Sequence, residues 1–301
     1  MTALPLSLVL IAALIHASWN LIAKKSGGDA RFALFTCVVL AIVWAPVGIW
    51  FGWRDAGSYG ALQWGLIVLS GAIHMAYYLI LLRGYRVGDL SVVYPLARGS
   101  APLLTALVAT SFLGEALRLL GWLGITGIVL GILLIAGGPA LLRSLRAGHG
   151  GDDATQRLRL GMQYGLLTGL FIAFYSVVDG YAVKHAGVSP ILLDYLGNLC
   201  RMPFLLAVLY WLHLRNPLGL RDYVKQMWRP ALIVGTVSPV SYVMVLYAAT
   251  MAPLSQVAPA REVSMLFATL FGGHLLGERD KGRRLFGALC IAAGVIALTQ
   301  S

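Results

Sequence analysis

The chain has 301 residues, of which 59% are hydrophobic and only 12% are charged, and its formal net charge is +11. A soluble domain carries about 25% charged residues, because its surface must face water. Together with a mean hydropathy of +0.80, these values exclude a soluble enzyme and a disordered chain, and they predict a protein embedded in lipid.

Ten apolar stretches are each close to the roughly 20 residues that a helix needs to cross a bilayer. They cover about 3–23, 31–52, 61–82, 90–113, 118–140, 160–183, 190–213, 230–251, 255–276 and 284–300. None shows the ten-residue alternating segments of a membrane β-barrel. The sequence therefore predicts an all-α integral membrane protein with ten transmembrane helices.

The first stretch is expected to be a retained helix rather than a cleaved signal peptide. Residues 1–15 carry no charged side chain, and Lys24 and Lys25 follow the apolar run instead of preceding it. His16, Trp19 and Asn20 lie on one face of this helix by their spacing. For Trp19, near the end of the span, an interfacial aromatic belt and an internal cavity are both open interpretations.

The third and fourth spans carry polar aromatic groups on shared faces. His74, Tyr77 and Tyr78 follow the helical spacing on the third span, and Tyr94 lies four residues before Arg98 on the fourth. We expect His74 and Tyr94 to line an internal cavity, while Tyr78 could also belong to an interfacial belt. A histidine in this place is either a protonation switch or a partner in a hydrogen-bond network.

Small residues mark the fifth and tenth spans. Four glycines of the fifth span form small-xxx-small pairs, which let helices approach closely, and two of the tenth span partly repeat this pattern. They are Gly121, Gly124, Gly127, Gly131, Gly287 and Gly294. We expect helix packing here, either within the chain or across a homodimer. Gly114-Glu115 and Gly277-Glu278 close spans, and are expected to serve structure.

The three cysteines, Cys37, Cys200 and Cys290, all fall inside predicted spans and make an odd count. Their spacing matches neither a disulfide framework nor a set of metal ligands. We therefore expect no metal site at the cysteines, which are small buried hydrophobic residues in this interpretation.

The sixth and seventh spans carry charged residues. Asp179 follows Tyr175 by four residues on the sixth span, and Asp194, Asn198 and Arg201 share one face of the seventh. A polar stripe inside a membrane must point into the protein or toward water. Arg201 is the best candidate on this stripe for binding a carboxylate, because a guanidinium can grip two oxygens at once.

The basic residues predict the orientation in the membrane. The first, third, fifth, seventh and ninth loops hold 17 Lys and Arg residues, whereas the alternate loops hold only Arg54, Arg118 and Lys184. Cytoplasmic loops are enriched in Lys and Arg, so the odd-numbered loops are predicted to be inside and both termini outside. The net charge is thus a topology signal, and nucleic acid is not an expected partner.

The chain divides into two similar halves around a basic linker. The predicted halves are residues 1–142 and 160–301, separated by residues 143–159, which we expect in the cytoplasm. Asp89-Leu-Ser91 and Pro95 match Pro253-Leu-Ser255 and Pro259 at an offset of 164, and Leu113-Gly-Glu115 matches Leu276-Gly-Glu278 at 163. Because each half has five spans, the halves must cross the membrane in opposite directions. An inverted repeat places a substrate site between its halves, which is typical of transporters.

The repeated segments resemble a known family. Val93–Arg98 through Gly114-Glu115, and their echo from Gln256–Arg261 through Gly277-Glu278, are similar to the EamA domain of the drug/metabolite transporter superfamily. This resemblance implies a ten-helix carrier in the inner cell membrane, usually a metabolite exporter, with no cofactor. Family members include amino-acid exporters and are commonly drawn with both termini inside, whereas the charge bias here predicts both termini outside.

Six ionisable residues lie within the spans or near their ends. Such groups are costly in lipid and are functional candidates by default. They are Arg98, Asp179, Asp194, Arg201, Arg261 and Glu262, and their charges sum to zero, which predicts mutual pairing. Arg98 and Glu262 correspond in the repeat and lie about 12 Å and 10 Å deep from opposite faces. We expect them to face the central cavity; the alternative is a structural salt bridge between the halves.

The leading functional hypothesis is a secondary transporter, an exporter of small polar or zwitterionic metabolites such as amino acids. A fixed arginine suits a carboxylate, a fixed glutamate suits an ammonium group, and the aromatic residues suit a ring or a cation. The chain has no Walker A sequence, so it does not itself carry ATP hydrolysis. Coupling to protons or another ion is open. The alternatives are a multidrug carrier for lipophilic cations, against which the arginines weigh, and a membrane scaffold without transport activity; an enzyme is not expected.

Overall fold

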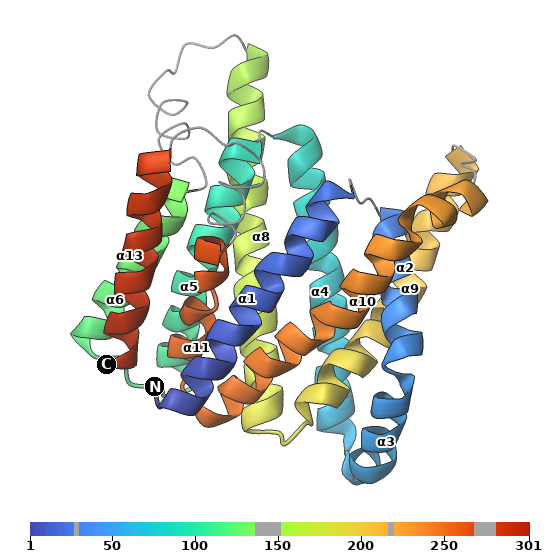
Figure 1. Cartoon of the computed structure of the whole chain (residues 1–301), viewed down its shortest axis with the longest axis horizontal. Helices are drawn as coiled ribbons and strands as arrows, with labels where there is room; N and C mark the ends of the chain where they lie inside the picture. Colours follow the sequence, from blue (N-terminus) through green and yellow to red (C-terminus); the bar gives the residue numbers. More distant parts are fainter. Residues whose placement is uncertain (27–29, 89, 136–151, 216–219, 268–280) are drawn as a thin grey trace.

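The structure, a computed structural model, describes residues 1–26, 30–88, 90–135, 152–215, 220–267 and 281–301. Within these ranges the chain forms helices and no β-strand (Figure 1). The helices are α1 (Ala3–Lys25), α2 (Ala30–Val43), α3 (Ala45–Asp55), η1 (Ala56–Ser58), α4 (Ala61–Val87), α5 (Leu90–Phe112), α6 (Leu119–Ile135), α8 (Asp152–Lys184), α9 (Pro190–Arg215), α10 (Leu220–Met251), α11 (Leu254–Ala260) and α13 (Lys281–Thr299).

Each of the ten predicted spans contains a helix, so the prediction of an all-α membrane protein is confirmed. Among the described residues, α1, α4, α5, α8 and α10 are each long and apolar enough to cross a membrane by length and composition. The second span is bent by 62° between α2 and α3, and this pair qualifies as a sixth. Helices α6 and α13 are apolar but shorter, α9 carries the charged stripe, and α11 is the first part of a broken helix.

Large apolar side chains cover the outside of the bundle. Leu123 on α6, Phe174 on α8 and Leu289 on α13 are 59%, 51% and 59% exposed, respectively. In water, an exposed surface of this kind would promote aggregation. Lipid removes that penalty, because the hydrocarbon interior is as apolar as these side chains.

The two halves are inverted relative to each other, and α6 and α13 show this most directly. A Cβ atom on Gly124 would lie 2.6 Å from the Gly294 carbonyl oxygen, and one on Gly131 would lie 2.5 Å from that of Gly287. The higher-numbered residue of one helix therefore meets the lower-numbered residue of the other, so the helices are antiparallel (Figure 1). Under the repeat offset, each of these two contacts maps onto the other, as a two-fold axis between the helices requires.

The other helix contacts follow the same symmetry. Helix α1 packs against α10, and its repeat equivalent α8 packs against α4. Similarly, α2 packs against α10 while α9 packs against α4, and α2 contacts its own equivalent α9. In the part of the chain that the structure describes, the helix contacts thus follow the pattern of an inverted repeat whose interface runs through the centre of the bundle.

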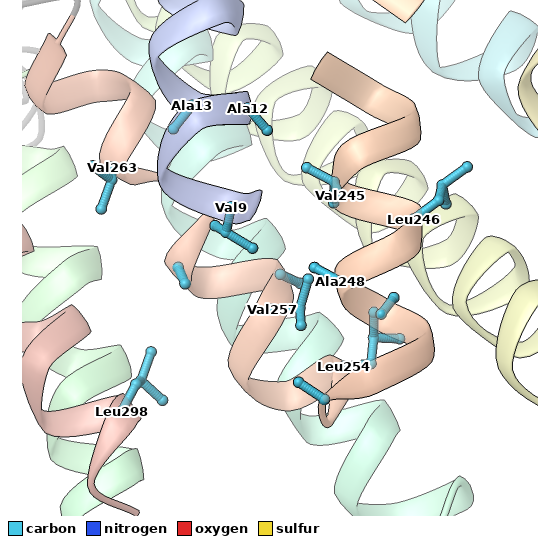
Figure 2. Close-up of a cluster of buried hydrophobic side chains, with 14 of the residues drawn as sticks. Val9, Ala12, Ala13, Val245, Leu246, Ala248, Leu254, Val257, Val263 and Leu298 are labelled. Atoms are coloured by element: carbon cyan, nitrogen blue, oxygen red, sulfur yellow. The ribbon is translucent and has the colours of Figure 1, made fainter. Parts of the chain in front are cut away.

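A dry core joins α1, α10 and the broken helix. Val9, Ala12 and Ala13 of α1 lie close to Val245 and Val257 from α10 and α11, and all five are at most 8% exposed (Figure 2). Small and branched side chains let these helices approach closely, as is usual inside membranes. This packing fixes α11 firmly against the first helix of the other half.

The chain ends and the linker complete the topology. The two termini lie at the same end of the molecule (Figure 1), where the Met1 amino group donates a hydrogen bond to the Thr299 carbonyl at 3.0 Å. Within the predicted linker 143–159, residues 152–159 are helical and form the start of α8, while residues 143–151 lie outside the described residues. The division into halves at 1–142 and 160–301 stays a prediction.

Candidate functional site

The predicted ninth span is not one continuous helix, and its break falls on two charged residues. Helix α11 ends at Ala260, and residues 263–267 are helical again, while residues 268–276 lie outside the described residues. Between them the backbone bonds shorten to the i to i+3 pattern, with Glu262 N–H donating to the Pro259 carbonyl and Met265 N–H donating to the Glu262 carbonyl. A short 3₁₀ turn inside a helix often marks a hinge. Here it presents Arg261 and Glu262 to the interior.

Glu262 meets Arg98 across the interface between the halves, as the repeat correspondence predicts. Arg98 Nη2 lies 2.8 Å from Glu262 Oε2, and the two side chains are 17% and 1% exposed. The contact is an ion pair without an aligned hydrogen bond. Arg98 also reaches the Ser264 hydroxyl at 3.5 Å, and Arg261 Nε lies 3.9 Å from Glu262 Oε1. We call Arg98, Arg261, Glu262 and Ser264 the Arg98–Glu262 cluster.

A second polar cluster surrounds Asp179 on α8, whose side chain is 1% exposed. The Tyr242 hydroxyl of α10 donates a hydrogen bond to Asp179 Oδ2, and His74 Nε2 of α4 lies 3.8 Å from the same oxygen. His74 Nδ1 is 2.9 Å from the Ser70 carbonyl, which can only accept, so Nδ1 carries a hydrogen. Tyr175 stacks on the His74 ring at 4.1 Å. We call Asp179, Ser70, His74, Tyr175 and Tyr242 the Asp179 cluster.

The two clusters touch through Arg261. Its guanidinium lies 6.0 Å from the centre of the Tyr175 ring, within the range of a cation–π contact. Arg261 also lines a cavity of about 20 Å³ together with Ser176, Asp179 and Tyr242. This volume has room for about one water molecule. Arg261 therefore stands between the two buried carboxylates, Asp179 and Glu262.

The polar stripe of α9 lies inside the protein, but its members have separate partners. Asp194 and Asn198 are buried at 7% and 1% exposure, and the Asn198 amide donates to the Cys37 carbonyl of α2 at 3.1 Å. Arg201 Nε donates to the Gly197 carbonyl of its own helix at 3.2 Å. Arg201 interacts electrostatically with Asp179 and Asp194, so it contributes charge to the interior without joining either cluster directly.

The remaining predicted site residues differ in how closely they approach the two clusters. Tyr94 donates from its hydroxyl to the Met265 sulfur at 3.1 Å, next to the Arg98–Glu262 cluster. Trp19 donates to the Ser241 hydroxyl of α10 at 3.2 Å, and Tyr78 is partly buried on α4. Asn20 is exposed, and its amide bonds back to the His16 carbonyl of the same helix, so it is not drawn into either cluster.

Glu115, which the sequence predicts to serve structure, ties the first half to the second. Its carboxylate accepts backbone N–H groups of Leu254 and Ser255 at 2.7 and 2.8 Å, and Lys184 Nζ lies 3.3 Å away. Burial would raise the pKa of Glu115, but these donors and the Lys184 charge outweigh it, and the pKa is lowered. Glu115 thus caps the first turn of α11.

None of these groups forms a metal site. In the part of the chain that the structure describes, no three His, Cys, Asp or Glu side chains are arranged to hold a metal ion. The groups instead form charge pairs and hydrogen bonds enclosed by the two inverted halves. Buried charge pairs at the interface of an inverted repeat are typical of proteins that move a solute across the membrane.

The family follows from comparison with known proteins. The EamA-like transporter family matches residues 3–137 and 159–300, so the chain belongs to this family, in keeping with the drug/metabolite transporter superfamily. The protein named "Uncharacterized transporter in cobO 3'region" from Sinorhizobium sp is 34% identical over 108 residues, which are 36% of this chain and 76% of that protein. A protein of known crystal structure shares the fold with a TM-score of 0.69 at 17% identity, over 100% of this chain and 98% of that chain. The chain is a multi-pass membrane transporter.

Proposed function

We propose that this transporter exports small zwitterionic metabolites, with amino acids as the substrate class, by alternating access around the Arg98–Glu262 cluster. The observation that carries the proposal is the buried ion pair between Arg98 and Glu262, which joins opposite charges from the two halves at 2.8 Å. An amino acid offers the same two charges a few atoms apart. It can therefore replace the internal pairing with two pairings of its own.

Each member of the pair suits one end of such a substrate. The Arg98 guanidinium presents several N–H donors in a fixed fork that matches a carboxylate. Glu262 is nearly fully buried, so an ammonium group bound there is screened little by water, and its attraction is correspondingly strong. Tyr94 and Ser264 lie beside the pair and offer hydroxyl groups to the substrate.

The break at Arg261 and Glu262 gives the site a mechanical role. When the substrate separates Glu262 from Arg98, the contact that holds the two halves together at this level is lost. The 3₁₀ turn allows the segment after Glu262 to reorient without moving α11, which is fixed by the core around Val257 and by the Glu115 cap. The halves can then rock and expose the site to the other side.

Uptake into proteoliposomes tests the substrate class. Purified protein is reconstituted, and exchange of a panel of labelled amino acids is measured for wild type, Glu262→Gln and Arg54→Gln, with rates normalised to folded protein. We expect Glu262→Gln to reduce exchange at least about tenfold, which corresponds to about 1.4 kcal/mol. Arg54 is exposed in the last turn of α3 and pairs with the neighbouring Asp55, away from both clusters, so Arg54→Gln should retain wild-type exchange. Exchange of lipophilic cations but of no amino acid would refute the proposal.

Swapping the charges of Arg98 and Glu262 distinguishes a substrate-binding pair from a purely structural salt bridge. The double variant Arg98→Glu with Glu262→Arg keeps the ion pair but turns it around relative to its neighbours Arg261 and Tyr94. If the pair binds substrate, the double variant should fold at wild-type yield and remain inactive. Restored transport would mean that the pair only holds the halves together, and the substrate site would have to lie elsewhere.

A further inference from the structure

We propose that the Asp179 cluster binds one exchangeable proton per transport cycle and that this proton is exchanged for the substrate. The inference rests on the proposed function, and it assigns to Asp179 and His74 a role separate from that of the Arg98–Glu262 cluster. It follows from the way in which the imidazole and the carboxylate face each other.

In this geometry, two hydrogen-bond acceptors point toward one another. His74 Nδ1 gives its hydrogen to the Ser70 carbonyl, so in a neutral ring Nε2 carries a lone pair. Nε2 lies 3.8 Å from Asp179 Oδ2, which is an acceptor when the carboxyl group is ionised. One proton, on Nε2 or on the carboxylate, converts this unfavourable approach into an attractive contact. The other carboxylate oxygen, Oδ1, makes no well-aligned hydrogen bond among the described residues, and the Ser70 hydroxyl is the additional donor near the carboxylate.

The surrounding charges favour a proton over a metal cation. The groups that face Asp179 and His74 are Tyr175 from α8, Arg201 and Asp194 from α9, Tyr242 from α10 and Arg261 after α11, with Arg98 of α5 beyond Tyr175. Hard metal cations need several oxygen ligands. Here the carboxylate is faced by an imidazole nitrogen, and the positively charged Arg261 side chain lines the adjoining cavity and would repel a cation. A proton needs only the facing pair.

Arg261 links this proton to the substrate. It interacts electrostatically with Asp179 and lies 3.9 Å from Glu262 Oε1. Adding a proton to the Asp179 cluster weakens the attraction between Arg261 and that cluster. Arg261 then pairs more strongly with Glu262 and competes with the ammonium group of the substrate. Proton and substrate therefore exclude each other, which is the requirement for exchange, and an inward proton gradient would drive export.

The test uses proteoliposomes and the labelled amino-acid panel. With an acidic lumen and a neutral medium, wild type should accumulate label above the equilibrium level, and a protonophore should abolish the accumulation. Accumulation that responds to a sodium gradient but not to pH would overturn the proposal.

Two aspartate variants locate the proton site. Asp179→Asn is neutral like the protonated carboxyl group, so Arg261 should compete with the substrate at every pH. Exchange of labelled for unlabelled amino acid should therefore weaken and lose its pH dependence, and the pH-driven accumulation should fall at least about tenfold. Asp153→Asn removes an exposed carboxylate at the start of α8, outside both clusters, and should retain both activities. The proposal fails if Asp179→Asn accumulates like wild type, if its exchange keeps the wild-type pH dependence, or if Asp153→Asn loses the coupling.

A third variant covers the case in which Asp179→Asn does not fold. Tyr242→Phe removes the hydroxyl that donates to Asp179 Oδ2 with little change in volume. Because a donor to a charged group contributes about 1.5–3 kcal/mol, its loss should move the pH midpoint of transport upward by about one to two pH units. An unchanged pH profile would contradict the assignment.

Infrared difference spectra test the proton site independently of the proposed substrate class. On acidification, wild type should show a carboxyl or imidazolium band that Tyr242→Phe shifts and Asp179→Asn alters, whether or not any amino acid is exchanged. Such bands in a protein that exchanges no amino acid would leave the proton site standing and refute the substrate class alone. Identical spectra in all three proteins would refute the proton site.

Discussion

A carboxylate that is 1% exposed inside a membrane protein is stable only if neighbouring groups compensate for its charge. Glu262 has Arg98 at 2.8 Å and Arg261 at 3.9 Å. Asp179 has the Tyr242 hydroxyl and the His74 ring, but no arginine within ion-pair distance among the described residues. The two acids therefore differ in their partners: Glu262 lies within ion-pair distance of two arginines, whereas Asp179 lies beside a histidine and a tyrosine hydroxyl.

The buried Arg98–Glu262 ion pair leads to a prediction about the stability of the protein. Glu262→Gln leaves the buried Arg98 guanidinium without its carboxylate and should lower the free energy of unfolding by about 3–5 kcal/mol. The double variant Arg98→Met with Glu262→Gln removes both charges and should recover most of that loss. Unfolding in detergent, followed by circular dichroism, measures both. Equal stability of Glu262→Gln and wild type would mean that the pair is not buried as described.

The sequence predicts only some of these residue contacts. The meeting of Arg98 and Glu262 follows from the repeat offset and their depths in the membrane, because both quantities are properties of the chain alone. The partners of Asn198 and Arg201 do not, since helical spacing gives a face but not the neighbour that covers it. For the same reason Asn20 shares a face with Trp19, yet only Trp19 reaches a partner on another helix.

Among the elements, α11 depends most on a residue outside itself. It has only seven residues, too few to be a stable helix alone, and no side-chain cap of its own at Pro253. Glu115 supplies that cap from the other half by accepting the Leu254 and Ser255 N–H groups. The cap anchors the start of the broken helix, whose other end carries Glu262.

Removal of the Glu115 charge should therefore weaken this element. The pKa of Glu115 is lowered from an ordinary value of 4.5, so its contribution is complete above that pH and is lost as the pH falls through the lower folded value. We expect Glu115→Gln to cost about 1–2 kcal/mol at neutral pH and to flatten the acid limb of the stability curve. Thermal unfolding between pH 7 and about pH 3 measures this. Asp153→Asn, an exposed acid at the start of α8, is the control and should keep the wild-type pH dependence.

The α6–α13 contact gives a sharper prediction, because neighbouring glycines differ in the space around them. A Cβ atom on Gly124 would lie 2.6 Å from the backbone oxygen of Gly294, whereas one on Gly127 would meet nothing closer than 3.4 Å. Gly124→Ala should therefore destabilise the protein by about 1–3 kcal/mol. Gly127→Ala should be within about 0.5 kcal/mol of wild type. Comparable losses for the two variants, measured by thermal unfolding in the same detergent, would contradict this antiparallel packing.

Hydropathy predicts the elements well, because each needs about 20 apolar residues to cross the bilayer. It does not predict where a span breaks. The bend after Val43 and the turn at Arg261 depend on local backbone bonding, for which Pro46 and Pro259 are the available signals. Proline alone is ambiguous: Pro203 and Pro239 lie inside continuous helices, since membrane helices tolerate proline when neighbours satisfy the freed groups.

Across the whole molecule, the two halves have similar backbones, but the polar side chains buried at equivalent helix contacts differ. Helices α1 and α10 are equivalent to α8 and α4, yet the first contact holds Trp19 and Ser241 whereas the second holds Asp179 and His74. In the proposed exchange, a proton site in one half makes the two arrangements of the halves chemically unequal. The gradients of proton and substrate, and not this asymmetry, set the direction of net transport.

Orientation in the membrane is the remaining whole-molecule prediction. The two termini lie at one end, and the predicted cytoplasmic loops, rich in Lys and Arg, begin at the other, so the charge bias places both termini outside. Single cysteines at Thr2→Cys and Ser301→Cys should react with a membrane-impermeant maleimide added to intact cells, above the background of the three native cysteines. Gln156→Cys, exposed near the start of α8 at the opposite end, should react only after the membrane is permeabilised. The reverse pattern would place both termini in the cytoplasm, and the proposed proton-driven export would then have to use the opposite arrangement of the halves.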